Sequence, residues 1–379
     1  MTEPKARNKP RFLFVVPPLT GHTNPAVSVG AELVARGHEV AWAGHPGSLQ
    51  PLLPADATIF PVLAGDLHDS REHGLRGAAA LKFFWEDFVI PLAHAMLPGT
   101  EAAIESFAPD VVVADQQAIA GAVAARRYGK IWVTSATTPA ELVRPLATMP
   151  KVEEWVSAQL AVFGQPVDLR FSEQLVLVFT TPSLMGDTSG FGDHYVFTGP
   201  ALTGRADSTP FPWDWLDPGR RHVLVSLGTL NGPAGERFFR VVTEALDDDL
   251  QAVVVGPPRE DAPENILFAE RVPQLALLPH LDAVVSHGGH NTVCESLAHG
   301  LPLVVTPIRD DQPIVAQQVA DAGAGIRLRF GRLRPAELRD AVRTVLDDAS
   351  YRAAAERIRD SFATAGGARA AADHLEKLL

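Results

Sequence analysis

The sequence predicts an α/β protein with two domains, each built around a parallel sheet. Short apolar runs that end in polar residues alternate with segments of helical spacing along the chain. A length of 379 residues suits two domains, and 46% hydrophobic residues suffice for two cores. Ligands of such sheets bind at the carboxyl ends of the strands, so the residues that follow each strand are the first candidates for a site.

Composition excludes several classes of protein. A net charge of -12 argues against nucleic acid as a partner. One cysteine, Cys294, excludes an internal disulfide framework and fits a reducing compartment. The apolar run after the basic segment 1–11 is too short for a signal peptide, and none reaches the roughly 18 residues that span a bilayer. We therefore expect a cytoplasmic monomer or homodimer without stable membrane insertion.

The chain opens as a βαβ unit. The expected order is strand 11–16, loop 17–25, helix 26–36 and strand 38–43. His22 lies in the loop at the carboxyl end of the first strand. It is either a histidine that anchors the following helix or a general base, because histidine titrates near neutrality without help.

A general base of this kind needs a carboxylate to fix its tautomer and to stabilise its charged form. Asp115 is the candidate, because it ends the expected strand 108–115 and precedes the expected helix 118–126. It could instead serve only as the N-cap of that helix. The two residues are 93 positions apart, so their pairing depends on the fold.

An aromatic segment, 65–98, interrupts the alternation of strands and helices. It is either ordinary core or the wall of an apolar pocket, and we favour the pocket because the neighbouring loops are long. The residues expected to line this apolar pocket are Phe84, Trp85 and Phe88. The remaining elements of the first half are expected at 131–135, 145–160, 175–179 and 195–198.

Turn-forming residues mark the domain boundary. Prolines and glycines are frequent between 199 and 221, and Trp213 and Trp215 would anchor this linker. We expect an N-terminal domain at 1–203, a linker at 204–220, a C-terminal domain at 221–350 and a final segment at 351–379.

Polar residues follow three strands of the second half, at one edge of its sheet. The expected strands are 222–226, 251–255, 266–268, 281–285 and 303–306, and the expected helices are 236–246 and 274–278. The polar residues are Ser226, Gly228 and Thr229, then the run 287–292, and then Asp311 and Gln312. Their convergence on one crevice favours a ligand.

The centre of this edge reads as strand, tight turn and helix. Gly288 and Gly289 let the backbone turn sharply and let a ligand come close. Asn291 or Thr292 can cap the helix that follows. The first N–H groups of such a helix lack partners and carry about half a positive charge, so this is a diphosphate site that needs no metal.

Each feature also has a purely structural interpretation. Thr292 and Glu295 fit a capping box. Ser226 and Thr229 could be turn hydroxyls, and Asp311 and Gln312 could cap the helix after them. The sequence has no Walker A motif and no dinucleotide fingerprint after a strand.

The motifs of the second half resemble the C-terminal signature of the family 1 glycosyltransferases. With the matching residues of the first half, the resemblance covers nearly the whole chain. The residues that carry it are Val272-Pro273-Gln274, Leu278-Pro279, His287-Gly288-Gly289-His290-Asn291-Thr292, Glu295, Pro302, Asp311-Gln312, Gly21-His22-x-x-Pro25 and Ser226-Leu-Gly-Thr229. It implies a GT-B fold, with two Rossmann-like domains facing across a cleft and the last helix crossing back to the N-terminal domain.

The resemblance also implies roles, position by position. The diphosphate would be held by Ser226, Gly228, Thr229, His287, Gly289, His290, Asn291 and Thr292. The residue at position 290 varies across the family. Val272 and Pro273 would contact the base, Glu295 the ribose, and Asp311 and Gln312 the sugar. His22 would deprotonate the acceptor, with Asp115 behind it.

We therefore expect an inverting transferase that moves a hexose or deoxyhexose from a UDP- or TDP-linked donor to an apolar natural-product acceptor, without a cofactor or metal. Two alternatives stay open: a nucleotide-sugar epimerase with the same fold, and a non-catalytic nucleotide-sugar-binding helper. The sequence does not identify the sugar, the nucleotide or the acceptor.

Overall fold

The computed structural model describes residues 9–63, 78–139, 142, 150–164, 167–204, 209–228, 233–259 and 261–379. The chain forms two compact units. Unit 1 contains residues 1–179, 189–205 and 365–379, and unit 2 contains residues 180–188 and 206–364. Each unit has its own sheet, and all described strand pairs are parallel.

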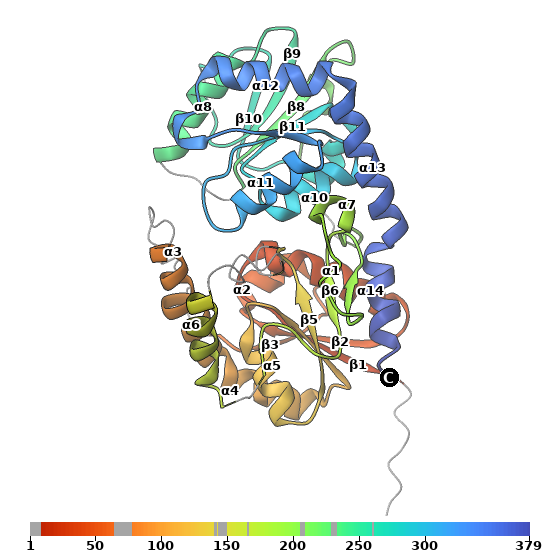
Figure 1. The fold of residues 1–379 in the computed structure, drawn as a ribbon. Helices are drawn as coiled ribbons and strands as arrows, with labels where there is room; N and C mark the ends of the chain where they lie inside the picture. The colour runs from red at the N-terminus through yellow and green to blue at the C-terminus, as the bar shows by residue number, and fades with distance from the viewer. Residues whose placement is uncertain are drawn as a thin grey trace, which may run out of the picture. The chain divides into compact units, whose positions relative to one another are not determined.

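Unit 1 contains a seven-stranded sheet in the order β3-β2-β1-β4-β5-β6-β7. Its strands are β1 (Arg11–Val15), β2 (Glu39–Gly44), β3 (Thr58–Pro61), β4 (Val111–Asp115), β5 (Ile131–Ala136), β6 (Val176–Val178) and β7 (Tyr195–Phe197). Its helices are α1 (Thr20–Ala35), α2 (Pro46–Leu49), α3 (Ala78–Phe83), α4 (Ile90–Phe107), α5 (Ile119–Arg127), α6 (Pro150–Ala161) and α14 (Gly367–Glu376), the last beside α1 (Figure 1).

The alternation of side chains along β1 assigns helices to the two faces of this sheet. Leu13 and Val15 point into a core with α4 and α5, whereas Phe12 and Phe14 point into a core with α1 and α14. Both faces are covered, which explains why the strands read as continuous apolar runs.

Unit 2 contains a six-stranded sheet in the order β10-β9-β8-β11-β12-β13. Its strands are β8 (Arg221–Ser226), β9 (Leu250–Val255), β10 (Ile266–Ala269), β11 (Ala283–Ser286), β12 (Leu303–Val305) and β13 (Gly325–Arg327). Its helices are α7 (Pro182–Met185), α8 (Pro233–Ala245), α9 (Gln274–Leu277), α10 (His290–Ala298), α11 (Gln312–Asp321), α12 (Pro335–Asp347) and α13 (Ala349–Ala365). These sheets confirm the predicted α/β class with two Rossmann-like domains.

The strand order reverses its direction once in each sheet, between β1 and β4 in unit 1 and between β8 and β11 in unit 2. In open parallel sheets, the carboxyl ends of the strands at such a switch point form a ligand crevice. The strand order therefore directs attention to the residues after β1 and β4, and to those after β8 and β11.

The structure corrects the expected start of the first helix. The sequence places a loop through Pro25, but α1 begins at Thr20 and contains Pro25. The proline lies near the helix N-terminus, where it removes one intrahelical hydrogen bond and leaves the rest of the helix intact. His22 therefore lies in the first turn of a helix instead of in a loop.

The two units depart from the expected domain boundaries in two places, at residues 180–188 and in the final segment. Residues 180–188 belong to unit 2, where Leu184 packs into the core and Thr181 Oγ1 lies 2.7 Å from Ser361 Oγ. The final segment is two helices instead of one. Gly366 separates α13 from α14 and Gly367 begins α14, with positive φ angles of 88° and 57°.

Ion pairs attach α14 to unit 1. Arg36, which follows α1, contacts Asp373 at 2.6 Å and Glu376 at 2.7 Å, and His38 Nε2 lies 2.6 Å from Glu376 Oε1. The same helix buries apolar side chains against α1. The last residues of the chain are thus part of the N-terminal unit.

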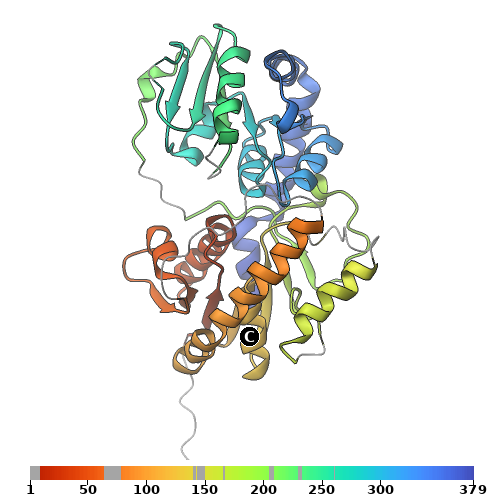
Figure 2. The ribbon, with the colours of Figure 1, turned by 90° about the vertical axis from the view of Figure 1, so that its left-hand side faces the viewer.

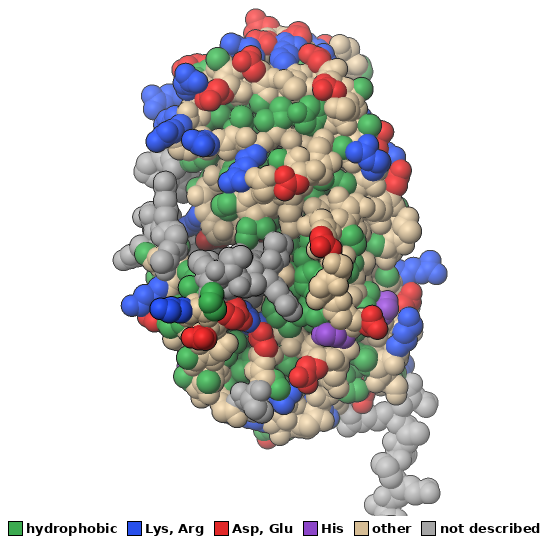
Figure 3. Space-filling model, viewed as in Figure 1, with side chains coloured by type: hydrophobic (Ala, Val, Ile, Leu, Met, Phe, Trp, Pro, Cys, Tyr) green, Lys and Arg blue, Asp and Glu red, His purple; other side chains and the backbone are tan. Residues whose placement is uncertain are grey.

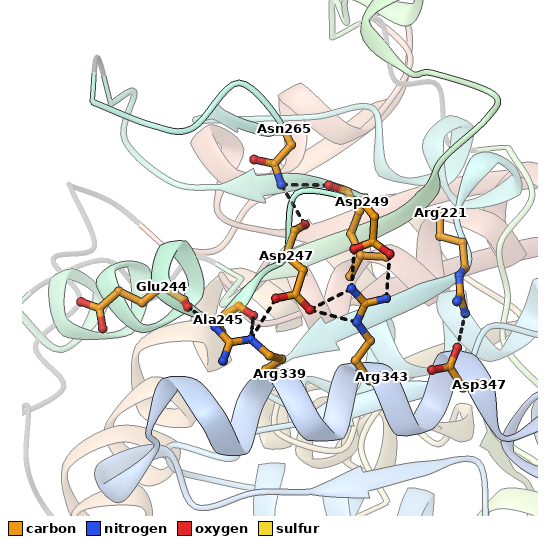
Figure 4. A network of polar contacts seen from close by, with 10 residues as sticks. Arg221, Glu244, Ala245, Asp247, Asp249, Asn265, Arg339, Arg343 and Asp347 are labelled. Carbon is orange, nitrogen blue, oxygen red and sulfur yellow. Dashed lines mark hydrogen bonds and ion pairs between the residues drawn. The ribbon is translucent and has the colours of Figure 1, made fainter.

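Another ion-pair network joins α12 to the amino ends of β8 and β9 (Figure 4). Arg343 contacts Asp247 at 2.8 Å and also pairs with Asp249, and Arg339 lies 3.0 Å from Asp247. Figure 3 shows acidic and basic side chains interspersed over α8 and α12. This network lies at the edge of the sheet opposite to the carboxyl ends of the strands.

Candidate functional site

The candidate site of unit 1 is a contact between a residue of the helix that follows β1 and the last residue of β4. His22 Nδ1 lies 3.1 Å from Asp115 Oδ1 and 3.1 Å from Oδ2. The carboxylate of Asp115 is fully buried, and the imidazole of His22 is 16% exposed. The fold therefore brings the two predicted residues together at the switch point of the sheet.

A third residue, Thr137, completes this group. It follows β5, and its Oγ1 donates a hydrogen bond of 2.7 Å to Asp115 Oδ2 and lies 2.7 Å from His22 Nδ1. Sequence reasoning missed it. Its sequence signal is a hydroxyl residue directly after a strand. That signal points to the site only once the strand order shows that β5 neighbours β4.

The hydrogen bonds around Asp115 fix the tautomer of His22. A carboxylate only accepts hydrogen bonds, and Asp115 Oδ1 also accepts the backbone N–H of Gln117 at 2.9 Å. Nδ1 of His22 therefore carries the ring proton, and Nε2 carries the lone pair. A histidine in this tautomer, held by a buried carboxylate, is suited to accept a proton at Nε2.

The aromatic residues expected to line an acceptor pocket divide into two groups. Trp85 is 2% exposed and belongs to the core with Val89 and Met96, so its assignment to the pocket wall is corrected. Phe84 and Phe88 are partly exposed, with ring centroids 6.1 Å apart. All three lie in a π-helical segment, Phe84–Val89, within the long helix that α3 and α4 form with it (Figure 2).

The candidate site of unit 2 lies after β8 and β11, where two serines have equivalent positions. Ser226 pairs with Ser286 across the strands. Ser226 Oγ accepts the N–H of Gly228 at 3.2 Å, and Ser286 Oγ accepts the N–H of Gly288 at 3.1 Å. The hydroxyl of Ser226 thus has a structural role in the turn. Thr229 lies outside the described residues.

Helix α10 begins two or three residues earlier than a cap at Asn291 or Thr292 requires. Its N-cap is Gly289, so His290, Asn291 and Thr292 are its first three residues. His290 is buried, with Nε2 3.5 Å from Cys294 Sγ, whereas Asn291 and Thr292 are partly exposed. The N–H groups of this first turn provide the partial positive charge expected for an anion site.

The imidazole of His287 lies directly against two glycines of this site. A Cβ on Gly289 would lie 2.7 Å from His287 Nε2, and a Cβ on Gly228 would lie 2.8 Å from His287 Cε1. Any larger residue at either position would have to displace the ring. The glycines thus serve the placement of His287 as well as the turn itself.

His287 is buried, with 9% of its surface exposed, and its Nδ1 has no hydrogen-bond partner. Its pKa is lowered to about 4, chiefly by burial and also by the charge of Arg309, while the backbone of Ser226 acts in the opposite direction. The imidazole is therefore neutral at pH 7 and contributes a polar ring instead of a positive charge.

The predicted base and ribose residues gather around Glu295. Its side chain is 4% exposed, and Oε2 accepts a hydrogen bond of 2.5 Å from Gln274 Nε2. The capping-box interpretation is wrong, because Thr292 is inside α10 and Glu295 is held by Gln274. Val272 and Pro273, which precede α9, are both buried.

The predicted sugar residues begin α11. Asp311 is the N-cap residue. Gln312 is 5% exposed, and its Oε1 accepts the backbone N–H groups of Ile308 at 2.9 Å and Arg309 at 3.1 Å. The carbonyl oxygen of Gln312 thus orders the loop before the helix, which leaves its amide nitrogen for other contacts.

Two negative observations complete the description. Within the described ranges, no three histidine, cysteine or acidic side chains form a group suited to a metal ion. Among the helices of the same ranges, none has the length and apolar content that a membrane span needs.

Comparison with known proteins relates the whole chain to enzymes of antibiotic biosynthesis. Residues 246–378 match a family described as erythromycin biosynthesis protein CIII-like, C-terminal domain. The chain is 32% identical to 4'-demethylrebeccamycin synthase of Lentzea aerocolonigenes, over 97% of this chain and 99% of the relative.

Two solved structures are similar along their full length. The glycotransferase of kitacinnamycin is 27% identical, with a TM-score of 0.80 over 98% of this chain and 100% of its own. Spinosyn rhamnosyltransferase SpnG complexed with thymidine diphosphate is 25% identical, with a TM-score of 0.74 over 97% of this chain and 100% of its own.

Proposed function

This chain belongs to the family 1 glycosyltransferases of the natural-product type, with the GT-B fold, and we propose that it transfers a sugar with inversion to a hydroxyl of an apolar acceptor. The enzyme class is a transferase that uses nucleotide-sugar donors. We propose three further points: inversion at the anomeric carbon, the identity of the catalytic residues and the apolar nature of the acceptor.

His22 is the proposed general base. Its Nε2 takes the proton of the acceptor hydroxyl as the acceptor oxygen bonds to the anomeric carbon. The bond from that carbon to the diphosphate oxygen breaks in the same displacement, and the electron pair leaves with the nucleoside diphosphate. Attack from the face opposite to the leaving group inverts the anomeric centre. The observation that carries this proposal is the contact of His22 with Asp115 and Thr137.

Asp115 acts through His22. A buried carboxylate against Nδ1 keeps the ring in the required tautomer and stabilises the imidazolium that forms during transfer. Proton abstraction by a positioned base typically accelerates a reaction about 10²–10⁴-fold. We assign a rate acceleration in this range to His22 with Asp115 and Thr137.

The donor is proposed to bind unit 2 without a metal or cofactor. The diphosphate would meet the first turn of α10 and His287, the ribose would meet Glu295, and the sugar would meet Asp311 and Gln312. A thymidine- or uridine-linked donor fits this assignment, and the thymidine diphosphate bound to the spinosyn rhamnosyltransferase favours the first of these. Phe84 and Phe88 are proposed to contact the apolar acceptor.

The test is a mass-spectrometric screen of several UDP- and TDP-sugars against a panel of hydroxylated aglycones. We expect at least one aglycone to gain the mass of a sugar, with one nucleoside diphosphate released per product and the anomeric configuration inverted. Incubation with donor alone is the control. An epimerised donor without any acceptor would instead identify an epimerase, and no diphosphate release across the panel would favour a binding protein.

A further inference from the structure

The diphosphate site proposed for unit 2 requires more positive charge than the predicted residues supply. His287 is neutral at pH 7, because burial holds its pKa near 4. The N-terminus of α10 contributes about half of a unit charge. A departing nucleoside diphosphate carries more negative charge than this, so a full cation is expected near the turn.

The loop after β12 is the part of unit 2 that lies against this turn. Thr306 N donates to Ser286 O at 2.8 Å, two residues before Gly288. A Cβ on Gly288 would lie 3.2 Å from the carbonyl oxygen of Gln312, at the other end of the loop. The loop 306–312 is therefore in contact with the turn at both of its ends.

Arg309 lies in the middle of this loop. Its backbone N–H is held by Gln312 Oε1 at 3.1 Å, and its carbonyl accepts the N–H of Gln312 at 3.2 Å. The side chain is 18% exposed, and its Nε is buried without a hydrogen-bond partner. The carboxylate of Asp310 is 3.5 Å from Nε and is half exposed to solvent.

A guanidinium keeps its charge at every accessible pH, and a largely buried one without complete hydrogen bonding is costly. A ligand anion would satisfy it, and the planar group is well suited to phosphate oxygens. Arg309 is also one of the groups that lower the pKa of His287, as expected if the two side chains are electrostatic neighbours.

We propose that Arg309 binds the diphosphate of the donor and stabilises its charge as it leaves. This inference rests on the proposed donor site in unit 2. It assigns Gln312 a second role as a positioning residue, because the oxygen of its side chain holds the backbone of Arg309.

The test compares Arg309→Gln with Arg327→Gln. Arg327 is exposed on β13 and bonds Gln317 at 2.8 Å, so its loss removes one charge from the same unit outside the site. Affinities for thymidine and uridine diphosphate and for the free nucleosides are measured by calorimetry at two salt concentrations. Thermal unfolding checks that each variant is folded.

We expect Arg309→Gln to weaken diphosphate binding about 10- to 100-fold, to leave nucleoside binding unchanged and to reduce the salt dependence. Arg309→Lys should recover part of the loss, and Arg327→Gln should bind as the unaltered protein does. Equal diphosphate affinity in Arg309→Gln and the unaltered protein overturns the inference and leaves the proposed function standing. An unaltered protein that binds neither diphosphate overturns both.

Discussion

Nδ1 of His22 is equidistant, at 3.1 Å, from the two carboxylate oxygens of Asp115. The two residues come from opposite sides of the switch point, one from the helix after β1 and the other from the end of β4. Because the carboxylate is fully buried, its interaction with the imidazole is little screened by solvent.

The first prediction concerns Asp115→Asn. The amide keeps the shape of the side chain but loses the charge that stabilises the imidazolium, so kcat should fall about 10²–10⁴-fold with nucleoside diphosphate affinity unchanged. Asp110→Asn is the control near the other end of β4, where the carboxylate accepts the N–H of Arg11. It should keep its activity. Full activity in Asp115→Asn would exclude a role for the carboxylate.

The second prediction concerns Thr137→Val. Valine keeps the volume but removes the hydrogen bond to Asp115 Oδ2, which leaves a buried carboxylate oxygen without that donor. We expect kcat to fall by about 10- to 150-fold, since hydrogen bonds to charged groups contribute about 1.5–3 kcal/mol and each 1.4 kcal/mol is about tenfold. Thr137→Ser should restore most of the rate in steady-state assays. A serine variant as slow as the valine variant would show that packing, and not the hydroxyl, matters.

The third prediction concerns Gly289→Ala. The new methyl group would lie 2.7 Å from His287 Nε2, so the ring has to move. We expect a loss of about 1–3 kcal/mol in the free energy of unfolding, together with weaker nucleoside diphosphate binding. In Gly331→Ala the added carbon meets nothing within 4 Å, so it should change neither. Urea titration and calorimetry measure the two effects, and unchanged binding in Gly289→Ala would contradict the assignment.

The fourth prediction concerns acid stability. Burial lowers the pKa of His287 from 6.5 to about 4, so the unfolded chain binds more protons than the folded protein between these values. Stability from this residue is complete above pH 6.5 and is lost as pH falls toward 4, by at most about 3 kcal/mol. His287→Gln should therefore lose less stability than the unaltered protein between pH 7 and pH 4.5 in urea titrations. Identical losses would show that His287 is not buried in its neutral form.

The alternation of apolar runs and helical segments predicted the two sheets, because parallel strands buried on both faces leave a strong signal. His22 and Asp115 could be predicted as candidates, since residues at the carboxyl ends of parallel strands share one edge of the sheet, but their pairing depended on the strand order. Thr137 was not predicted, because a hydroxyl after a strand points to a site only once the strand order places β5 beside β4.

Three further features lie beyond local sequence patterns. Trp85 belongs to a helix that is aromatic on several sides, so its pattern does not show which side faces the core. Arg309 precedes the Asp311-Gln312 pair, and only the buried position of its side chain distinguishes it from a surface arginine. Residues 180–188 join unit 2 through tertiary packing of Leu184, which follows no boundary signal in the chain.

The central claim is that His22 removes the proton of the acceptor while the donor binds unit 2. The most direct measurement is single-turnover sugar transfer by His22→Gln, with nucleoside diphosphate affinity measured on the same preparation. We predict transfer slower by about 10²–10⁴-fold and an affinity within twofold of the unaltered protein. Transfer at the unaltered rate in this variant would contradict the claim.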